Sequence, residues 1–335
     1  MNPVPIPAAI PAGREERAAF ARALGRVGVF CGGRSSEREI SLLSGGAVLA
    51  ALRAEGVDAH PFDPAQASLA DLESRGFDRA FLILHGRYGE DGAIQGVLET
   101  LRIPYTGSGI LASATAMDKI ATKRIWSSLG IPTPAWTAPG PDGEGVEGLG
   151  RPGGRLVVKP SAEGSTIGLS KVATGDGAAL ASALAKARAC GGAPLVEECI
   201  EGREVTCGIL GQGAGATALP LIEIVVPDAN YDYQNKYFTD AARYLCPAPL
   251  EDALAGEISA LCLRAYRALG ARGWGRVDVM LREEGAGLRP YLLELNTAPG
   301  MTDHSLVPMA ARAAGIPMGD LVLRVLAAAR LEIAP

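Results

Sequence analysis

The sequence has few aromatic residues, no cluster of basic residues and no long apolar run. Only 5% of its 335 residues are aromatic, and its net charge is -5. Nucleic-acid surfaces need basic residues for phosphate contacts and aromatic ones for base stacking, so this composition argues against a nucleic-acid partner. No apolar run approaches the roughly 20 residues of a membrane-spanning helix. We expect a globular protein without membrane association that acts on a small molecule.

The cysteines also lack a pairing pattern. The six of them are scattered, with no C-x-x-C pair, in a chain too large to depend on disulfides. We expect reduced, buried thiols. The start, MNPVPIPAAIPAG, lacks the charged region and continuous apolar core of a signal peptide, which favours a cytoplasmic protein. Residues 1–25 are expected to form a poorly ordered extension, although residues 14–25 could form one short helix.

Length and a hydrophobic content of 48% allow two or three domains. From residue 26 to 108, predicted strands alternate with helices, which is typical of an α/β domain with a parallel sheet. Ser36 and Glu39 have capping-box spacing at the start of the first of these helices. Residues 109–198 read as a helix ending at Gly130, a Pro/Gly-rich connection and an α+β unit with a glycine-rich loop. Residues 199–335 form a third predicted domain. The expected class is therefore α/β, or α+β overall.

Two predicted strands near the C-terminus carry polar side chains on one face. Side chains two residues apart on a strand share a face, which groups Arg276 with Asp278 and Glu294 with Asn296. Their neighbours are apolar, so these carboxylates lie on otherwise buried strands and need a cation. Such oxygen ligands suit Mg²⁺, which takes one or two carboxylates together with water and substrate phosphates. The pattern indicates nucleotide chemistry, although for either acid alone an ion pair with a basic residue is the simpler interpretation.

Eight motifs stand in a characteristic order: GGRSSEREISL, LHGRYGEDG, PYTGSG, MDK, VVKPSAEGSTIG, YDYQNKY, GWGRVDVM and LLELNTAPGMTDHSLVPMA. Their ordered combination resembles the D-alanine:D-alanine ligases of the ATP-grasp superfamily, from Arg26 to Leu331. The resemblance implies a three-domain ATP-grasp architecture with an N-terminal parallel-sheet domain. It also implies a two-step reaction for peptidoglycan precursor synthesis. The carboxylate of one D-alanine takes the γ-phosphoryl group of ATP, and the amine of a second D-alanine then displaces phosphate.

The resemblance implies a site for the first D-alanine. Glu37 would hold its ammonium group and connect through hydrogen bonds to Ser165 and Tyr237. His85 would lie close by, with a buried, satisfied histidine as the alternative. An anion at the start of a helix is also favoured by the helix dipole, which is the simpler explanation for Glu37.

The same resemblance implies an oxyanion hole made by Arg276 and the Gly300 amide, which would stabilise charge in the transition state. Ser305 and the Leu306 amide would bind the carboxylate of the second substrate at a helix start. Asp278, Glu294 and Asn296 would be the ligands of two Mg²⁺ ions, with Mn²⁺ possible in their place.

For ATP, the implied contacts fall into four groups. Lys119, Lys159 and Lys236 resemble phosphate clamps, with exposed, snorkelling side chains as the alternative for Lys119 and Lys236. The remaining implied contacts, from the adenine hinge, the ribose site and the pocket wall, are Glu197, Glu198, Ile200, Glu204 and Leu293. A solvated acidic strand edge is the alternative for the hinge. Many members carry lysine, tryptophan and phenylalanine where this chain has Glu198, Cys199 and Asn230, so its adenine pocket differs.

The expected partners are two D-alanine molecules and a second copy of the chain in a homodimer. The intact YDYQNKY segment with Tyr237 favours a dipeptide ligase over variants that make D-alanine:D-lactate or D-alanine:D-serine products. Another ATP-grasp carboxylate–amine ligase and a nucleotide-binding regulatory protein without chemistry are the remaining alternatives. Residues 227–246 and the glycine-rich loop are predicted to close over the site and exclude water.

Overall fold

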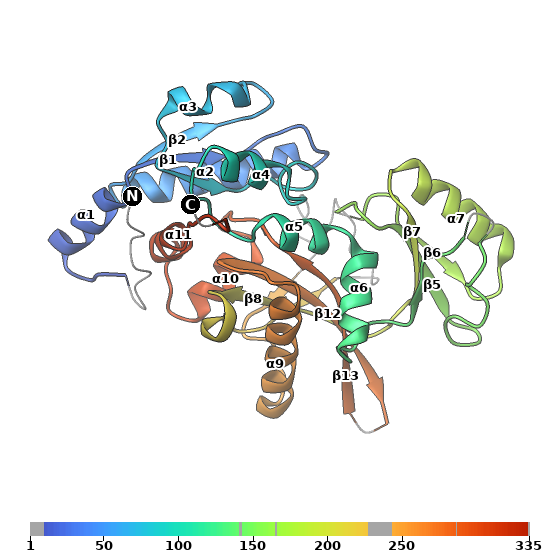
Figure 1. The fold of residues 1–335 in the computed structure, drawn as a ribbon. Coiled ribbons are helices and arrows are strands. Elements are labelled where there is room, and N and C mark those ends of the chain that lie inside the picture. The colour runs from blue at the N-terminus through green and yellow to red at the C-terminus, as the bar shows by residue number, and fades with distance from the viewer. Residues whose placement is uncertain (1–9, 141–142, 165, 227–242, 286, 334–335) are drawn as a thin grey trace.

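The computed structural model describes residues 10–140, 143–164, 166–226, 243–285 and 287–333. Three sheets with their helices form three neighbouring bodies, with the central body set apart from the other two (Figure 1). One sheet is parallel and the other two are antiparallel. The predicted mixed architecture with an N-terminal parallel sheet is confirmed.

The N-terminal sheet consists of β1 (Arg26–Phe30), β2 (Asp58–Phe62) and β3 (Arg79–Leu82), in the order β2-β1-β3. Its helical elements are α1 (Arg14–Ala23), α2 (Arg38–Ala54), η1 (Leu69–Asp71), α3 (Leu72–Arg75) and α4 (Ala93–Thr100). Four consecutive residues of β1 are buried, as expected for a central parallel strand covered on both faces. The loops that follow β1 and β3 supply residues of the site described below.

Helix α1 lies within the segment for which we expected poor order. Arg17 donates hydrogen bonds to Glu55 at 2.5 Å and to Asp320 at 2.7 Å, which ties α1 to α2 and to the C-terminal helix. Ala21 and Leu24 are fully buried. The expectation of a poorly ordered extension is therefore wrong for residues 14–24, and residues 1–9 lie outside the described part of the chain.

The predicted capping box at the start of α2 is absent. The helix begins at Arg38 with Glu37 as its N-cap residue, and no side chain caps it. Ser35 takes a different role, because its hydroxyl accepts from the Glu37 amide at 3.2 Å and donates to the His85 carbonyl at 2.7 Å. The loop is thereby fastened to the end of the neighbouring strand, and the Glu37 side chain is left to face the site.

The single helix expected before Gly130 is two helices, α5 (Ile110–Met117) and α6 (Lys119–Ser128). Asp118 separates them, because its backbone is extended and its carboxylate accepts from the amides of residues 120 and 121. Trp126 is fully buried and donates to the Ala265 carbonyl at 3.2 Å. Helix α6 therefore packs with the C-terminal sheet, and the predicted domain start at residue 109 does not match the packing.

The central sheet has the order β4-β7-β5-β6 and is covered by α7 (Gly177–Ala189). Its strands are β4 (Trp136–Thr137), β5 (Arg155–Pro160), β6 (Ser170–Ala173) and β7 (Pro194–Glu198). Leu156 and Val158 of β5 are buried in the core under α7. Because side chains alternate along a strand, Val157 and Lys159 face the opposite side, toward the third body.

The C-terminal sheet follows the order β11-β10-β8-β12-β13, with β9 paired to β8. Its strands are β8 (Arg203–Leu210), β9 (Thr217–Ala218), β10 (Ile222–Val225), β11 (Arg243–Leu245), β12 (Trp274–Glu284) and β13 (Gly287–Asn296). The helical elements are η2 (Gly213–Gly215), α9 (Asp252–Ala268), α10 (Leu306–Ala313) and α11 (Met318–Ala327). Val277 and Val279 point into the core beneath α9, so Arg276 and Asp278 point to the opposite face. Helices α10 and α11 join the hydrophobic core of the N-terminal body.

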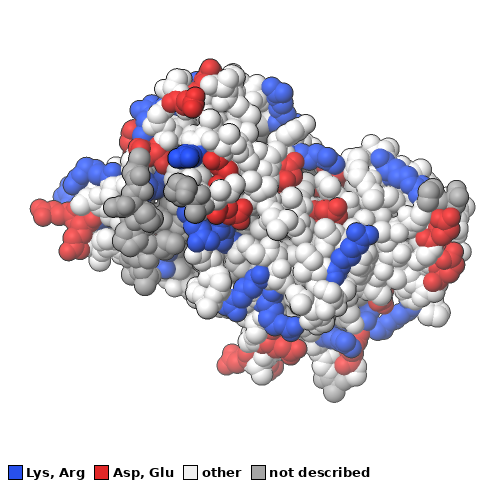
Figure 2. Space-filling model, in the orientation of Figure 1, with Lys and Arg blue, Asp and Glu red and all other residues white. Residues whose placement is uncertain are grey.

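All six cysteines lie in the described residues and none forms a disulfide; Cys31, Cys207 and Cys262 are buried. No single described helix is long and apolar enough to span a membrane. Helices α10 and α11 together have the length and apolar composition of a span, but the pair is bent by 108°. On the face shown in Figure 2, acidic and basic side chains are interspersed.

Candidate active site

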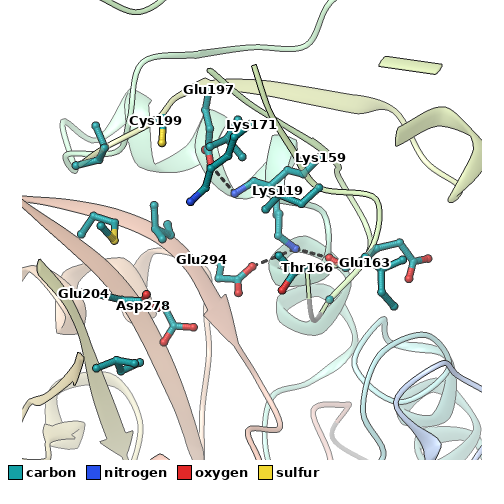
Figure 3. Close-up of a pocket in the computed structure, with 18 of the residues that line it drawn as sticks. Lys119, Lys159, Glu163, Thr166, Lys171, Glu197, Cys199, Glu204, Asp278 and Glu294 are labelled. Atoms are coloured by element: carbon teal, nitrogen blue, oxygen red, sulfur yellow. Dashed lines mark hydrogen bonds and ion pairs between the residues drawn. The ribbon is translucent and has the colours of Figure 1, made fainter. Parts of the chain in front are cut away.

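Two adjoining cavities lie where the three bodies meet. The larger, about 240 Å³, is lined by residues of β5 and β7 on one side and of β8, β12 and β13 on the other (Figure 3). The smaller, about 50 Å³, reaches toward the N-terminal domain. Both are lined by Lys119, Gly164, Arg276 and Glu294. The two cavities therefore adjoin at these four residues.

A buried cluster of two lysines and one glutamate lies on the central-sheet side of the larger cavity. Glu197 of β7 pairs with Lys159 at 2.5 Å and with Lys123 of α6 at 2.8 Å. The Lys123 ammonium, whose side chain is 0% exposed, also donates to the Thr133 hydroxyl at 2.5 Å. The predicted alternative of a solvated acidic edge is wrong for Glu197, whose side chain is only 3% exposed.

The charges of this cluster support one another. Burial opposes ionisation of Glu197, but the Lys123 and Lys159 ammonium groups outweigh it and hold its pKa at about 2. Burial also opposes the charge on Lys159, yet Glu197 and Glu294 raise its pKa. For Lys123 burial prevails and lowers the pKa. With both lysines protonated the cluster has a formal charge of +1, and Lys159 lines the cavity.

Lys119, the first residue of α6, joins the glycine-rich loop to β13 (Figure 3). Its ammonium group donates to the Glu163 carbonyl at 2.8 Å and pairs with Glu294 at 3.1 Å. Its backbone amide donates to the Ser161 carbonyl at 2.9 Å. The side chain is 10% exposed, so the alternative of a snorkelling surface lysine is wrong for Lys119. Lys236 lies outside the described residues.

The polar face predicted for β12 and β13 is present. Asp278 lies directly opposite Glu294, and Arg276 directly opposite Asn296. Arg276 binds both oxygens of Asp278, at 2.7 and 2.6 Å, and the Asn296 amide donates to Asp278 at 2.9 Å. Asp278 therefore forms the ion pair expected with a basic residue and also lies beside the other two oxygen-bearing side chains, Glu294 and Asn296.

The donor set here fits a particular kind of cation. No group of three or more His, Cys, Asp and Glu residues able to hold a metal occurs in the described part of the chain. Asp278, Glu294 and the Asn296 side-chain oxygen supply two carboxylates and one amide. That set fits Mg²⁺, which usually completes its coordination with phosphate oxygens and water.

Strand β13 contains a β-bulge at Leu293. The register pairs Asp278 with Glu294 but Val279 with Leu292, which leaves Leu293 without a partner on β12. Leu292 is fully buried in the core, whereas Leu293 and Glu294 both line the larger cavity. Strict alternation would turn Leu293 away from the face that carries Glu294, and the bulge explains why both residues line the same cavity.

The Glu37 carboxylate lies between two glycines of different loops. A Cβ atom added at either Gly86 or Gly164 would stand 2.9 Å from Glu37 Oε2. The glycine-rich loop and the loop after His85 therefore approach Glu37 as closely as they do because both positions lack a side chain. Ser165, the next residue of the loop, and Tyr237 lie outside the described residues.

The remaining walls of the smaller cavity come from the segment after β13 and from the N-terminal domain. Gly300 and His85 line it, and His85 Nε2 lies 3.4 Å from the Ser44 hydroxyl. Ser305 is the N-cap residue of α10, and its hydroxyl accepts from the Thr302 amide at 2.9 Å. A Cβ added at Gly300 would stand 2.8 Å from Ser305 Oγ. Gly300 and Ser305 are therefore close neighbours.

The other predicted contacts also line the larger cavity: Glu198, Cys199, Ile200, Glu204 and Leu306. Glu198 forms an ion pair with Arg282 at 2.7 Å, and Arg151 lies 3.4 Å away. The wall next to Cys199 is thus held by a salt bridge. Every predicted site residue that the structure describes, apart from Ser305, lines one of the two cavities.

Comparison with known proteins agrees with this geometry. Residues 144–327 match the family model "D-ala D-ala ligase C-terminus", and residues 58–108 match "D-ala D-ala ligase N-terminus". The D-alanine–D-alanine ligase of Ralstonia pickettii is 58% identical over 315 residues, 93% of each chain. That of Cupriavidus metallidurans is 57% identical over 317 residues, 94% of each chain. The chain belongs to the D-alanine–D-alanine ligase family.

A solved structure supports the same assignment. The D-alanine–D-alanine ligase from Bacillus anthracis complexed with ATP aligns with a TM-score of 0.75 and 33% identity. The alignment covers 90% of this chain and 96% of that chain. The family resemblance and the ATP-grasp architecture expected from the ordered motifs are confirmed.

Three residues at the site were not predicted for this member of the D-alanine–D-alanine ligase family. Lys123 was missed although it lies four residues after Lys119, a spacing that places both on one helix face. Lys171 lines the larger cavity from β6. Glu90 lines the smaller one and lies in the LHGRYGEDG motif, from which only His85 was assigned a role.

Proposed function

We propose that this protein joins two D-alanine molecules into D-alanyl-D-alanine, with ATP as the energy source and Mg²⁺ as the metal. One observation carries the proposal: in this member of the family, the larger cavity, with its lysines and carboxylates, adjoins the smaller cavity, which contains Glu37 and Gly300. The regulatory alternative without chemistry loses support, because the described candidate positions hold competent residues and lie together.

ATP occupies the larger cavity in this proposal. Lys119 and Lys159 contact its phosphates, and Ile200, Glu204 and Leu293 surround the nucleoside. Glu197 orients Lys159, and the wall with Glu198 and Cys199 shapes the adenine side. The glycine-rich loop offers backbone N–H groups to phosphate oxygens. Lys236 belongs to the same proposed set.

Asp278, Glu294 and Asn296 hold the proposed Mg²⁺ ions. When bound, the metal neutralises phosphate charge and helps to align the transferred group. Lys119 reaches the same place through its ion pair with Glu294, so its charge adds to that of the metal. Arg276 orients Asp278 through hydrogen bonds to both of its carboxylate oxygens.

The first D-alanine occupies the smaller cavity, and the second binds beside it, next to Gly300. Glu37 binds the ammonium group of the first D-alanine, supported by Ser165 and Tyr237, with His85 close by. The Gly300 amide and Arg276 stabilise the oxygen that becomes negatively charged during the second step. Ser305 and the Leu306 amide, at the start of α10, bind the carboxylate of the second D-alanine.

The wider assignments belong to this proposal as well. The protein acts in the cytoplasm, where it supplies peptidoglycan synthesis, and it forms a homodimer. Its N-terminal domain spans residues 26–108. Helices α5 and α6 pack with the core beneath α9, which supports a central unit that starts after residue 131 and ends near 198. The C-terminal unit begins at about residue 199.

The direct test incubates purified protein with ATP, Mg²⁺ and D-alanine and measures phosphate and dipeptide. We expect one phosphate per dipeptide formed and no phosphate release that depends on D-alanine when Mg²⁺ is removed. Parallel reactions with D-serine or D-lactate as the second substrate separate the dipeptide ligase from its variants. Absence of D-alanine-dependent phosphate would refute the proposal.

A further inference from the structure

The segment between β13 and α10 carries the Gly300 amide, and two side chains of the N-terminal domain hold it. Glu90 Oε1 accepts from the Ala298 amide at 3.0 Å. The Ser44 hydroxyl accepts from the Met301 amide at 3.2 Å. Gly300 lies between these two fixed amides. Its own N–H direction is therefore set by contacts with residues more than 200 positions earlier in the chain.

Glu90 and Ser44 both belong to the N-terminal domain and make further contacts within it. The second oxygen of Glu90 accepts from the Gly86 amide at 2.9 Å, so one carboxylate bridges two backbone segments. Ser44 is fully buried in α2 and lies against His85. The pair thus fastens the segment after β13 to the segment of residues 85–86. Both segments line the smaller cavity, the first with Gly300 and the second with His85 and Gly86.

We propose that Glu90 and Ser44 are positioning residues that aim the Gly300 amide at the reacting carbonyl oxygen. The inference rests on the proposed ligase function. In the second step the amine attacks the carbonyl carbon of the acylphosphate, the new C–N bond forms, and the carbonyl electron pair moves onto oxygen. When that pair returns, the bond to the phosphate oxygen breaks, phosphate leaves with the electrons, and the proton released by the amine passes to the leaving phosphate.

This role acts on one step of the reaction. Transfer of the phosphoryl group to the carboxylate depends on the lysines and the metal site and creates no tetrahedral carbon. A donor aimed at the carbonyl oxygen stabilises charge that develops only in the second step. Loss of the two anchors should therefore slow amide formation while acylphosphate formation continues.

The decisive variants are Glu90→Gln and Ser44→Ala. Glutamine has nearly the same size, but its amide group presents N–H donors to one of the two backbone N–H groups, so one of the hydrogen bonds is lost. Ser44→Ala removes the acceptor for Met301. Glu99→Gln is the matched control, because Glu99 is also a buried carboxylate that accepts a backbone N–H, from residue 332, and lines neither cavity.

Two rates are compared in each variant. Dipeptide formation reports the whole reaction, and positional isotope exchange in ATP labelled at the β,γ-bridging oxygen reports reversible acylphosphate formation. We expect dipeptide kcat to fall by about 10- to 100-fold, as for a small misplacement of a catalytic group. The KM for ATP and the rate of isotope exchange should change by less than about 3-fold, because neither depends on the Gly300 amide. Glu99→Gln should behave as wild type.

An unchanged ratio of isotope exchange to dipeptide formation in both variants would overturn the inference, since a general loss of structure slows both steps alike. If Glu90→Gln does not fold by circular dichroism, Ser44→Ala decides the question alone. Failure of the ligase proposal looks different: the wild-type protein would then show neither D-alanine-dependent exchange nor dipeptide.

Discussion

Replacing Lys123 by methionine tests whether the buried lysine–glutamate cluster stabilises the fold. Methionine fills nearly the same volume, so the change removes the charge and the hydrogen bond to Thr133 without leaving a large cavity. Glu197 keeps its second partner, Lys159, at 2.5 Å. The substitution therefore measures what the second ammonium group adds to a carboxylate that is already paired.

The magnitude follows from two opposing terms. At an effective dielectric constant of about 20, unit charges at the 2.8 Å separation of Lys123 and Glu197 attract by about 6 kcal/mol. Burial opposes the charge of Lys123 strongly enough to lower its pKa, so the cost of desolvation, several kcal/mol, offsets this attraction. We therefore expect the unfolding free energy to change by no more than about 1 kcal/mol, and the melting temperature by no more than roughly 2 °C.

Thermal unfolding followed by circular dichroism measures this shift. Thr133→Val is the matched control, because it removes only the hydrogen bond and should cost about 1 kcal/mol. A loss of about 3 kcal/mol or more for Lys123→Met would refute the argument that desolvation offsets the attraction. In the folded variant, Glu197 neutralises Lys159 alone, so the KM for ATP should rise more than kcat falls.

Three further predictions concern the two cavities. Asp278→Asn should reduce dipeptide formation at least about 100-fold while circular dichroism stays unchanged, since it removes one of two metal-binding carboxylates; activity near wild type would exclude the metal assignment. Gly164→Ala should raise the KM for D-alanine more than that for ATP, because its Cβ would stand 2.9 Å from Glu37 Oε2. A selective effect on ATP would count against the Glu37 site. Burial and the Glu37 charge, opposed by two backbone N–H groups and Arg276, raise the Glu90 pKa to about 7. As pH falls through 7, protonation of Glu90 weakens its hydrogen bonds to the Gly86 and Ala298 amides, so dipeptide kcat of the wild type should decrease below pH 7. The same decrease of kcat in the Glu90→Gln variant would refute the role assigned to Glu90.

The same Glu90 pKa has a consequence of opposite sign for stability. Because the folded protein binds this proton more tightly than the unfolded chain, the contribution of Glu90 to stability is greatest below about pH 4.5 and falls as pH rises through 7. Activity and stability should therefore change in opposite directions across this range.

Sequence patterns predicted the parts of the structure that depend on local periodicity. Alternation along β12 and β13 correctly placed Asp278, Glu294 and Asn296 on one face, because side-chain direction on a strand repeats every two residues. The parallel sheet followed from alternating strands and helices. The site roles came from resemblance to a family, since spacing alone does not show which loops meet.

Features that depend on tertiary contacts were missed. Asp118 interrupts an apolar helical pattern, and its capping role depends on which residue adopts the extended backbone. Lys123 is buried only because Glu197, 74 positions later, and Thr133 surround it. Packing of Ala21 and Leu24 against the core outweighed the Pro-rich start, and α1 is ordered for that reason.

The bulge at Leu293 determines how closely apolar and acidic side chains are spaced along one wall of the larger cavity. A regular strand shows only every second side chain to one surface, so neighbouring positions of that surface are about 7 Å apart along the strand. Here the apolar Leu293 and the carboxylate of Glu294 are consecutive and line the same cavity, so the wall changes from apolar to acidic within one residue. A nucleotide has its own sharp change from flat base to charged phosphates. Deleting the extra residue would return β13 to strict alternation and separate the two kinds of surface that such a ligand needs side by side.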